Sequence, residues 1–297
     1  MSNRKFIVEI QGGLGNQLFG LAFANYVSEG QSREFAISDI QVDRGITEHG
    51  VRITDFDLDL KICKDKRINS NLDRVLSSVN RRTPQLQKIK GLMNLGTYHS
   101  SVTGYDPTAE KYKFNRYKGY FQSHIYAFSL KKKLTRGLLA PRDPSSWFLD
   151  KLEEAQEVQP IMMHVRRGDY YKVKNLFGIL SDSFYRDALA LIRGTGNNRP
   201  IWVFSDSPES LSDSYLSTLG GSANVVNPKS SAPAVESLAL MQFGSANVIS
   251  NSTFSWWPAF LSQTSTMTVC PSDWFLNMEQ PLELIPKSWI KVKSDWL

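Results

Sequence analysis

Short apolar runs alternate along the chain with segments whose apolar residues recur at helical spacing. The first run, residues 6–10, ends in a stretch with three glycines, and apolar residues then recur at roughly helical intervals from Leu18 to Val27. This succession predicts a strand, a glycine turn and a helix, which is the opening of an α/β unit.

A second alternation of the same kind begins near residue 157. An apolar run at 161–165 follows a segment with helical spacing at 147–156. Further strands are predicted at 200–204 and 247–250, and further helices at 183–192, at 235–243 and over the segment that holds Trp256, Trp257 and Phe260. Such alternation predicts parallel sheets that bind ligands at the carboxyl ends of their strands. We therefore expect two Rossmann-like domains facing one cleft.

The composition is that of an ordinary globular protein, with 41% hydrophobic and 22% charged residues. It excludes a disordered or collagen-like chain. The N-terminal residues include no hydrophobic region of signal-peptide type, and no run of about 20 apolar residues occurs, so we expect a cytoplasmic protein. The two cysteines, Cys63 and Cys270, fit a reducing compartment and offer no zinc spacing.

Basic residues are concentrated in the first half of the chain. The net charge is +6, but residues 61–142 contain 18 Lys and Arg against 4 Asp and Glu, so the remainder carries −8. An anionic membrane surface, nucleic acid and a set of solvated helix faces would each account for such a region. No nucleic-acid motif accompanies the charge, so we expect no nucleic-acid binding and keep peripheral contact with the inner membrane face as a hypothesis. Within this region, residues 69–90 predict helical or irregular structure.

The segment from His164 to Tyr170 carries the clearest chemistry. A buried strand delivers Arg166 and Arg167 to a glycine turn that also holds Asp169. Arginine suits a diphosphate because its planar guanidinium donates parallel hydrogen bonds and stays charged, and a cation there stabilises a departing diphosphate. Strand alternation points the two arginines in opposite directions, so we expect them to have different roles. The alternative is a strand end capped by a salt bridge, in which Asp169 holds Arg167 or His164.

Two further motifs are weaker. Gly13 and Gly15 match the first half of a dinucleotide fingerprint, but Leu18 stands where a third glycine is needed. The turn therefore indicates backbone close to a ligand, and a nicotinamide site is excluded. The acidic stretch from Asp55 to Asp59 could hold Mg²⁺, but its alternation of polar and apolar residues is typical of a half-exposed strand, and we expect no metal site.

Hydroxyl and amide side chains gather at the start of the last predicted helix. Asn251, Ser252 and Thr253 would either frame an anion site at the helix N-terminus or serve as plain N-caps, with the tryptophans in the core. Among the acids, Asp206 at a strand end and Glu236 within a helix are the candidates to accept guanine N–H groups. In isolation each is better explained as a cap or a surface charge.

Five segments together resemble the α-1,2-fucosyltransferases of glycosyltransferase family 11, in their soluble bacterial form. They are residues 12–19, 119–123, 164–170, 203–206 and 249–257, and they run almost from end to end of the chain. The resemblance implies an α/β fold of GT-B-like type with two facing Rossmann-like domains. Residues 1–156 would form the acceptor-side domain with the basic helical region. Residues 157–297 would bind GDP-fucose, and the last helix is a candidate to pack back on the first domain.

The resemblance also implies an activity. It is the inverting transfer of L-fucose from GDP-β-L-fucose to the 2-hydroxyl of a terminal β-galactoside, in a glycan or O-antigen type oligosaccharide, without a metal or cofactor. The alternatives are a fucosyltransferase that forms another linkage or uses another GDP-sugar, and a non-catalytic carbohydrate-binding protein on the same scaffold.

The same resemblance suggests which residues meet the donor. Arg166 matches the arginine on the diphosphate, and Asn16 matches a residue near the fucose and the diphosphate. The full set of candidate donor-binding residues is Gly13, Gly15, Asn16, Gln17, His164, Arg166, Arg167, Ser205, Asp206, Glu236, Asn251, Ser252, Thr253 and Phe254. Residues 244–247 depart from the Cys-x-His-Asn pattern of the family. The family also tends to hold an acid near position 237, where this chain has Glu236 and Ser237, and this leaves the guanine contact open.

Arg166 and Asp169 are the candidate catalytic residues. The expected reaction is an in-line displacement at C1 of fucose, in which the protein positions two substrates and neutralises the leaving GDP. A general base has to lie within hydrogen-bond reach of the acceptor hydroxyl. Asp169 and His49 are the candidates that the sequence offers for it.

Overall fold

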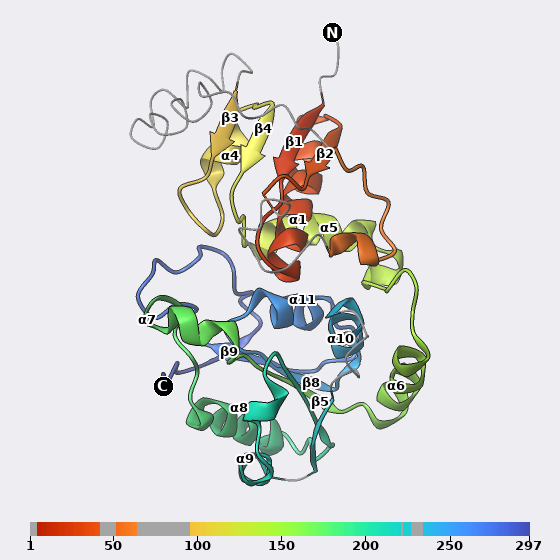
Figure 1. The fold of residues 1–297 in the computed structure, drawn as a ribbon, viewed down its shortest axis with the longest axis vertical. Coiled ribbons are helices and arrows are strands. Elements are labelled where there is room, and N and C mark those ends of the chain that lie inside the picture. Colours follow the sequence, from red (N-terminus) through yellow and green to blue (C-terminus); the bar gives the residue numbers. More distant parts are fainter. Residues whose placement is uncertain (1–4, 42–51, 64–95, 221, 227–233) are drawn as a thin grey trace. The chain divides into compact units, whose positions relative to one another are not determined.

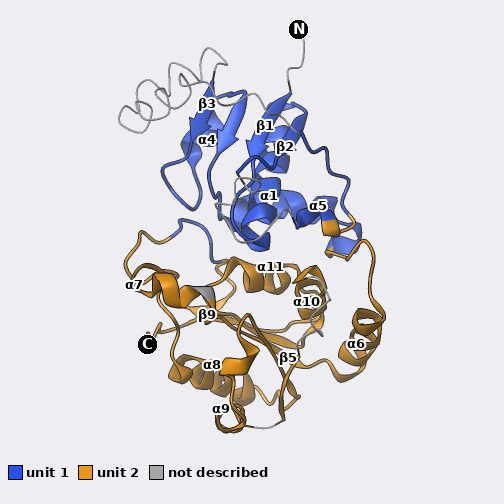
Figure 2. Cartoon of the chain, viewed as in Figure 1, with its two compact units in different colours: residues 1–54, 58–137, 281–285 blue, residues 55–57, 138–280, 286–297 orange. Residues whose placement is uncertain are grey.

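The computed structural model describes residues 5–41, 52–63, 96–220, 222–226 and 234–297, with the backbone alone for Asp169. The chain divides into two compact units (Figure 2). Unit 1 comprises residues 1–54, 58–137 and 281–285, and unit 2 comprises residues 55–57, 138–280 and 286–297. Figure 1 labels the helices and strands of both.

Unit 1 is built on a four-stranded sheet in the order β2-β1-β4-β3, in which every pair of neighbours is parallel. Its strands are β1 Phe6–Glu9, β2 Phe35–Ser38, β3 Thr97–His99 and β4 Arg116–Lys118. Its helices among the described residues are α1 Leu14–Gln31, α4 Pro107–Lys111, α5 His124–Lys133 and the 3-10 turn η2 Thr135–Gly137. The 3-10 turn η1 Ile53–Asp55 lies where the chain passes from unit 1 to unit 2.

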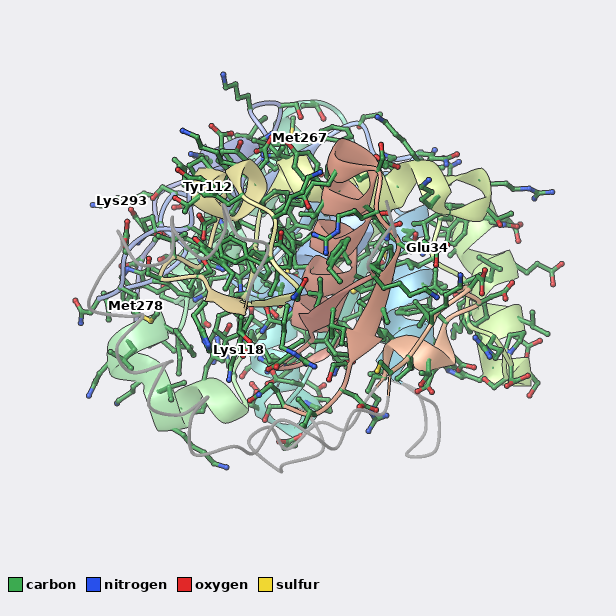
Figure 3. The ribbon with its side chains drawn as sticks, turned by 90° about the horizontal axis from the view of Figure 1, so that it is seen from above. Glu34, Tyr112, Lys118, Met267, Met278 and Lys293 are labelled. Atoms are coloured by element: carbon green, nitrogen blue, oxygen red, sulfur yellow. The ribbon has the colours of Figure 1, made fainter. Side chains whose placement is uncertain are left out.

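The two faces of this sheet differ in polarity. On one face, aromatic side chains pack edge to face: the ring of Phe23, from α1, lies 5.3 Å from Tyr117 and 5.2 Å from Tyr126. On the other face, Glu9 is buried and forms an ion pair of 3.1 Å with Arg116. Lys118, labelled in Figure 3, ends β4 at 4.0 Å from the same carboxylate. Burial of a carboxylate is tolerable here because cations accompany it.

Unit 2 is built on a six-stranded parallel sheet in the order β10-β9-β8-β5-β6-β7. Its strands are β5 Ile161–Val165, β6 Ile201–Ser205, β7 Ala223–Val225, β8 Ala246–Val248, β9 Thr268–Pro271 and β10 Ile290–Val292. Its helices are α6 Ser146–Val158, α7 Lys174–Phe177, α8 Asp182–Gly194, α9 Asp213–Thr218, α10 Ala234–Leu240 and α11 Thr253–Leu261, with 3-10 turns η3 Asp169–Val173, η4 Pro208–Ser210 and η5 Met241–Phe243.

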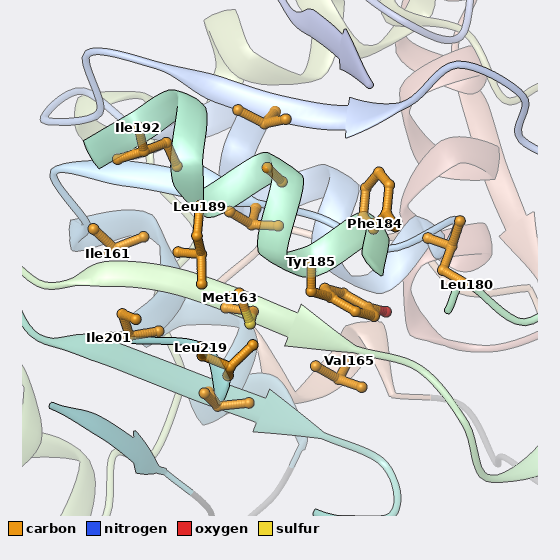
Figure 4. Packing of buried hydrophobic residues seen from close by; sticks show 14 of the residues in the cluster. Ile161, Met163, Val165, Leu180, Phe184, Tyr185, Leu189, Ile192, Ile201 and Leu219 are labelled. Carbon is orange, nitrogen blue, oxygen red and sulfur yellow. The ribbon is translucent and has the colours of Figure 1, made fainter. Parts of the chain in front are cut away.

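Strand alternation in β5 builds a core on each face of this sheet. Met163 and Val165 face α8, whose Phe184 and Ala188 are one turn apart and pack against them together with Leu189 (Figure 4). Met162 points the other way and packs with buried residues of α6 and α10. A strand covered on both faces has to be apolar throughout, which explains the continuous run at 161–165.

The strands and helices expected at 6–27, 147–165, 183–204 and 235–260 are confirmed, and both sheets are parallel. The boundary at residue 156 is wrong, because Phe148 and Ala155 of α6 pack with Met162 in the core of unit 2. The segment that returns to unit 1 is the loop 281–285 and no helix, since the chain after α11 contains only strands and loops. Asp55 ends a 3-10 turn and Phe56 makes an isolated bridge to Pro141, so the expected strand at 55–59 does not form. The stretch 69–90 lies outside the described residues.

Candidate functional site

The strand order of unit 2 creates a topological switch point. The chain starts at the central β5, moves outward through β6 and β7, and then returns to β8 on the other side before moving outward again. The connections after β5 and β8 therefore diverge, and open parallel sheets bind ligands in the crevice that such a divergence leaves. The segments 166–170 and 249–254 directly follow these two strands, so the sheet brings the two most specific sequence motifs together.

Arg166 lies just beyond β5 between a carboxylate and an aromatic ring. Its Nε atom is 3.2 Å from Oδ2 of Asp206, and its guanidinium carbon lies 5.1 Å from the ring centre of Tyr170. The side chain is 17% exposed. The guanidinium is thus held in place from two sides at the switch point while still reaching solvent.

Arg167 has different partners. Its backbone N–H donates to Oδ1 of Asp206 at 2.9 Å, while its guanidinium pairs with the carboxylate of Asp182 and lies 5.3 Å from the ring centre of Tyr215. The two guanidinium groups therefore have separate partners, as strand alternation predicted, although Asp206 also accepts the backbone N–H of Arg167. The contacts of the Arg167 side chain are those of an anchor between β5 and α8, and a contact with the donor stays a prediction for it.

Gly168 is required by the position of Asp206. A Cβ atom on residue 168 would lie 2.6 Å from Oδ2 of Asp206, closer than such atoms approach one another. One carboxylate thus contacts Arg166 and Arg167 and would have to shift to make room for a side chain at residue 168. Asp206 is the residue that sets the shape of this turn, and a role for it in binding guanine stays a prediction.

His164 is buried and neutral. Its Nδ1 atom lies 2.8 Å from Oγ of Ser250, and its ring centre lies 5.4 Å from that of Phe254. Burial, with a smaller contribution from the charge of Arg166, lowers the pKa of His164 to about 3. The imidazole therefore links the end of β5 to the segment after β8 and does not exchange protons near neutral pH.

The start of α11 is capped as the sequence predicted. Oγ of Ser252 accepts the N–H of Phe254 at 3.3 Å, and Thr253 is the first helical residue. Asn251 is buried, and its Nδ2 donates to the carbonyl oxygens of Phe177 and Trp274 at 2.9 and 3.3 Å. The amide of Asn251 thereby fastens the loops around the switch point, which is a structural role.

Two other candidates in unit 2 have local partners. Oγ of Ser205 accepts the N–H of Ser207 at 3.1 Å and so caps its own turn. Glu236 is fully buried, and its two oxygens accept the N–H and the hydroxyl of Ser145, each at 2.7 Å. These contacts favour a structural role for Glu236 at the start of α6, and its contact with guanine stays a prediction.

The glycine turn of unit 1 connects β1 to α1. Gly12 has a φ of 72°, and a Cβ there would lie 2.7 Å from Nδ2 of Asn16. Gly13 is the N-cap of α1 and provides no side-chain cap, and Gly15 is buried in the first turn. Oδ1 of Asn16 accepts a hydrogen bond of 2.9 Å from Nε2 of Gln122. Asn16 is therefore fixed at the carboxyl end of β1, where ligands of such sheets bind.

Gln17 has a structural role in the same turn. It is fully buried, its Nε2 donates to the carbonyl oxygen of Gly12 at 3.0 Å, and its Oε1 accepts the N–H groups of Arg52 and Ile53 at 3.0 and 3.3 Å. A buried amide with these bonds shapes the turn, and a direct contact of Gln17 with the donor stays a prediction.

Asp169 and His49 are the candidate general bases. The side chain of Asp169 and the whole of His49 lie outside the described residues. Within the described ranges, no group of three or more His, Cys, Asp or Glu side chains could hold a metal ion. In the same ranges, no helix is both long and apolar enough to cross a membrane.

Sequence reasoning did not name several residues that contact the candidate residues within each unit. Asp182 and Tyr215 hold Arg167, and Gln122 holds Asn16. Asp182 lies at the start of the predicted helix after the arginine segment, which offered a signal for it. Gln122 lies in segment 119–123, one of the five that carry the family resemblance, which offered a signal for it. Tyr215 meets Arg167 only in the folded chain, so the sequence pattern offered no signal for Tyr215.

Comparison with known proteins identifies the family. The model described as "Glycosyl transferase family 11" matches residues 68–292. The chain belongs to glycosyl transferase family 11. A protein of Escherichia coli named alpha-1,2-colitosyltransferase is 23% identical over 298 residues, which cover 97% of this chain and 99% of the relative. The O-antigen biosynthesis glycosyltransferase WbnK of Escherichia coli is 29% identical over 134 residues, 44% of this chain and 43% of the relative.

Among solved structures, the fucosyltransferase NodZ from Bradyrhizobium is similar in fold. It superimposes with a TM-score of 0.50 at 15% sequence identity, over 87% of this chain and 92% of NodZ. This likeness shows the α/β fold alone. The resemblance to family 11 that the sequence motifs carried is thus confirmed by the family match, and the protein is a glycosyltransferase.

Proposed function

We propose that this family 11 enzyme transfers L-fucose from GDP-β-L-fucose to the 2-hydroxyl of a terminal β-galactoside, with inversion and without a metal ion. The family supports sugar transfer. The names of the two Escherichia coli relatives, an alpha-1,2-colitosyltransferase and an O-antigen biosynthesis glycosyltransferase, support the linkage and an acceptor of O-antigen type. The donor, the linkage and the acceptor are each part of the proposal.

One observation carries the proposal, namely the guanidinium of Arg166 at the switch point of the six-stranded sheet. A nucleotide bound in the crevice after β5 and β8 would direct its diphosphate toward this cation and toward the N-terminus of α11. Negative charge grows on the diphosphate as the bond to C1 of the sugar breaks. A cation held ready at that point stabilises the transition state more than the ground state.

The other residues of the turn would keep Arg166 ready. Asp206 forms an ion pair with Arg166 and accepts a hydrogen bond from the backbone of Arg167. The guanidinium of Arg166 is therefore already ordered before the substrate binds. His164 stays neutral and adds no second charge to the crevice. In this account Arg166 contacts the substrate and its neighbours position it.

A second donor is favoured by one comparison. The relative that matches this chain from end to end is named a colitosyltransferase. Colitose is L-fucose without the 3-hydroxyl, so a site that hydrogen-bonds this hydroxyl would reject GDP-colitose, while a site lined by apolar groups there would accept both. GDP-colitose is therefore the alternative donor.

The decisive experiment offers both donors to the purified protein. GDP release is followed with a β-galactoside in the presence of EDTA, and the linkage of the product is determined by NMR. We expect transfer from GDP-fucose to the 2-hydroxyl, and an Arg166→Ala variant with at least a hundredfold lower kcat. Preference for GDP-colitose would correct the donor. Activity that is lost in EDTA and restored by Mn²⁺ would contradict the metal-independent mechanism, and an active Arg166→Ala variant would contradict the role of Arg166.

The basic region 61–142 and the cytoplasmic location belong to the proposal as well. Its described part includes Lys131, Lys132 and Lys133 in the last turn of α5, where Lys132 and Lys133 are exposed. Each cation near an anionic membrane surface contributes about 1 kcal/mol to binding. We propose that this region holds the enzyme on the inner face of a membrane, next to a lipid-linked acceptor.

A further inference from the structure

The amide of Gln122 is a buried polar group that the proposed mechanism does not use. It lies four residues beyond β4, is 5% exposed, and its backbone N–H donates to the carbonyl oxygen of Thr103 at 2.7 Å. Its Nε2 donates to Oδ1 of Asn16 at 2.9 Å, while its Oε1 is buried and has no hydrogen-bond partner among the described residues. An apolar side chain of similar size would avoid the unpaired acceptor, so the amide needs an explanation.

The turn that presents Gln122 is tightly built. Phe121 has a left-handed φ of 52°, which is unfavourable for a residue other than glycine, and its ring stacks on that of Phe23 at 3.7 Å. Gly119 makes room for this arrangement, because a Cβ there would lie 2.8 Å from the ring of Phe121 and 2.7 Å from Cβ of Ser100. Backbone strain is retained where the surrounding structure holds a residue in one position. The position of Gln122 is therefore fixed by its neighbours.

This fixed position determines which end of the Asn16 amide faces outward. Because Oδ1 accepts from Gln122, Nδ2 is the end that can donate elsewhere, and within the described part of the chain it has no hydrogen-bond partner. The absence of a side chain on Gly12 leaves space for Nδ2 beside the turn. The Nδ2 group of Asn16 thus lies at the carboxyl end of β1, in the first turn of an 18-residue helix that no side chain caps.

We propose that Gln122 is a positioning residue, which holds the Asn16 amide so that Nδ2 donates to an oxygen of the sugar-nucleotide donor. This inference rests on the proposed function, because that function supplies the ligand. If both amides were turned over, Asn16 would present an acceptor, Oδ1, to the same oxygen and repel it. Gln122 therefore acts on the substrate through Asn16, without touching it.

Three variants test the orientation of the amide. Gln122→Glu keeps the shape but replaces the Nε2 donor by a carboxylate oxygen, which attracts Nδ2 of Asn16 and turns the amide over. Asn16→Asp keeps the acceptor for Gln122 and removes the Nδ2 donor. Gln122→Met keeps the volume and leaves the Asn16 amide unfixed. We expect kcat/KM for GDP-fucose to fall by about ten- to a hundredfold in the first two variants and by less in Gln122→Met.

Non-additivity separates positioning from a general structural role. Asn16→Asp removes the Nδ2 hydrogen-bond donor, so adding Gln122→Met to this variant should lower kcat/KM little further. If the two residues acted independently, the double variant would show the product of the two single losses in kcat/KM. Gln122→Met should also unfold at the same temperature as the wild type or a higher one, because it removes the unpaired acceptor.

Wild-type kcat/KM in Gln122→Glu, or full multiplication of the losses in the double variant, would overturn the inference while leaving the proposed function intact. A wild-type protein that transfers sugar from neither GDP-fucose nor GDP-colitose would refute the proposed function, and the inference with it.

Discussion

Replacing Asp206 by alanine tests whether one carboxylate holds the arginine turn. Asp206 accepts the N–H of Arg167 at 2.9 Å and lies 3.2 Å from Nε of Arg166. A hydrogen bond to a charged group contributes about 1.5–3 kcal/mol, and the 19% exposure of the Asp206 side chain reduces the value. We expect the free energy of unfolding to fall by about 2–4 kcal/mol for the two contacts together.

Asp206→Ala should also lower kcat/KM, and by more than the loss of folded protein alone would account for. Without the carboxylate, the guanidinium of Arg166 is no longer fixed at the end of β5, and a displacement of about 1 Å can reduce the rate by a factor of about 100. Urea unfolding and kcat/KM for GDP-fucose measure the two effects. Glu209→Gln is the matched control, because Glu209 is an exposed acid on the same segment. If Asp206→Ala kept more than half of the wild-type kcat/KM, our account of the turn would be wrong.

Three further predictions concern other parts of the molecule. His164 has a pKa of about 3 in the folded protein and about 6.5 in the unfolded chain, so below pH 6.5 only the unfolded chain takes up its proton. The free energy of unfolding should therefore fall by up to about 1.4 kcal/mol per pH unit as the pH drops from 6.5 toward 3. Urea unfolding at pH 7, 6 and 5 should show this slope, and the His164→Gln variant should lack that part of it. Gly168→Ala should lower kcat/KM at least tenfold, because the Cβ of the new alanine would displace the carboxylate of Asp206 and, with it, Arg166. A wild-type kcat/KM in this variant, measured by steady-state kinetics, would contradict the described packing of the turn. Exchange of Lys132 and Lys133 for Glu should lower the affinity for anionic vesicles, measured by co-sedimentation, by about thirtyfold or more. If the wild-type protein bound neutral vesicles as well as anionic ones, membrane contact through these lysines would be contradicted.

The elements around the site could be predicted because local spacing determines them. The helix at 183–192 was evident from apolar residues one turn apart, and the continuous apolar run at 161–165 indicated a strand covered on both faces. The serine before α11 indicated its N-cap. Strand alternation also predicted that the side chains of Arg166 and Arg167 have different partners, and their guanidinium groups do contact different carboxylates.

The features that were missed depend on contacts between distant parts of the chain. Asp206 and Asp182 meet the arginine turn from 39 and 15 residues away. Their places at a strand end and at a helix start were evident from the sequence, but no local pattern paired them with the turn in place of Asp169. The unit to which α6 belongs is decided by what Phe148 packs against, and a helical pattern gives no information about that. The return of residues 281–285 to unit 1 depends in the same way on folded contacts, such as the hydrogen bond of 2.8 Å from the N–H of Tyr105 to the carbonyl of Leu282.

A crystal structure of the enzyme with GDP bound tests the central claim most directly. Our account predicts that the nucleotide occupies the crevice after β5 and β8 and that a guanidinium nitrogen of Arg166 lies about 2.7–2.9 Å from a phosphate oxygen. A diphosphate bound elsewhere in the molecule, with Arg166 in contact only with Asp206 and Tyr170, would contradict it.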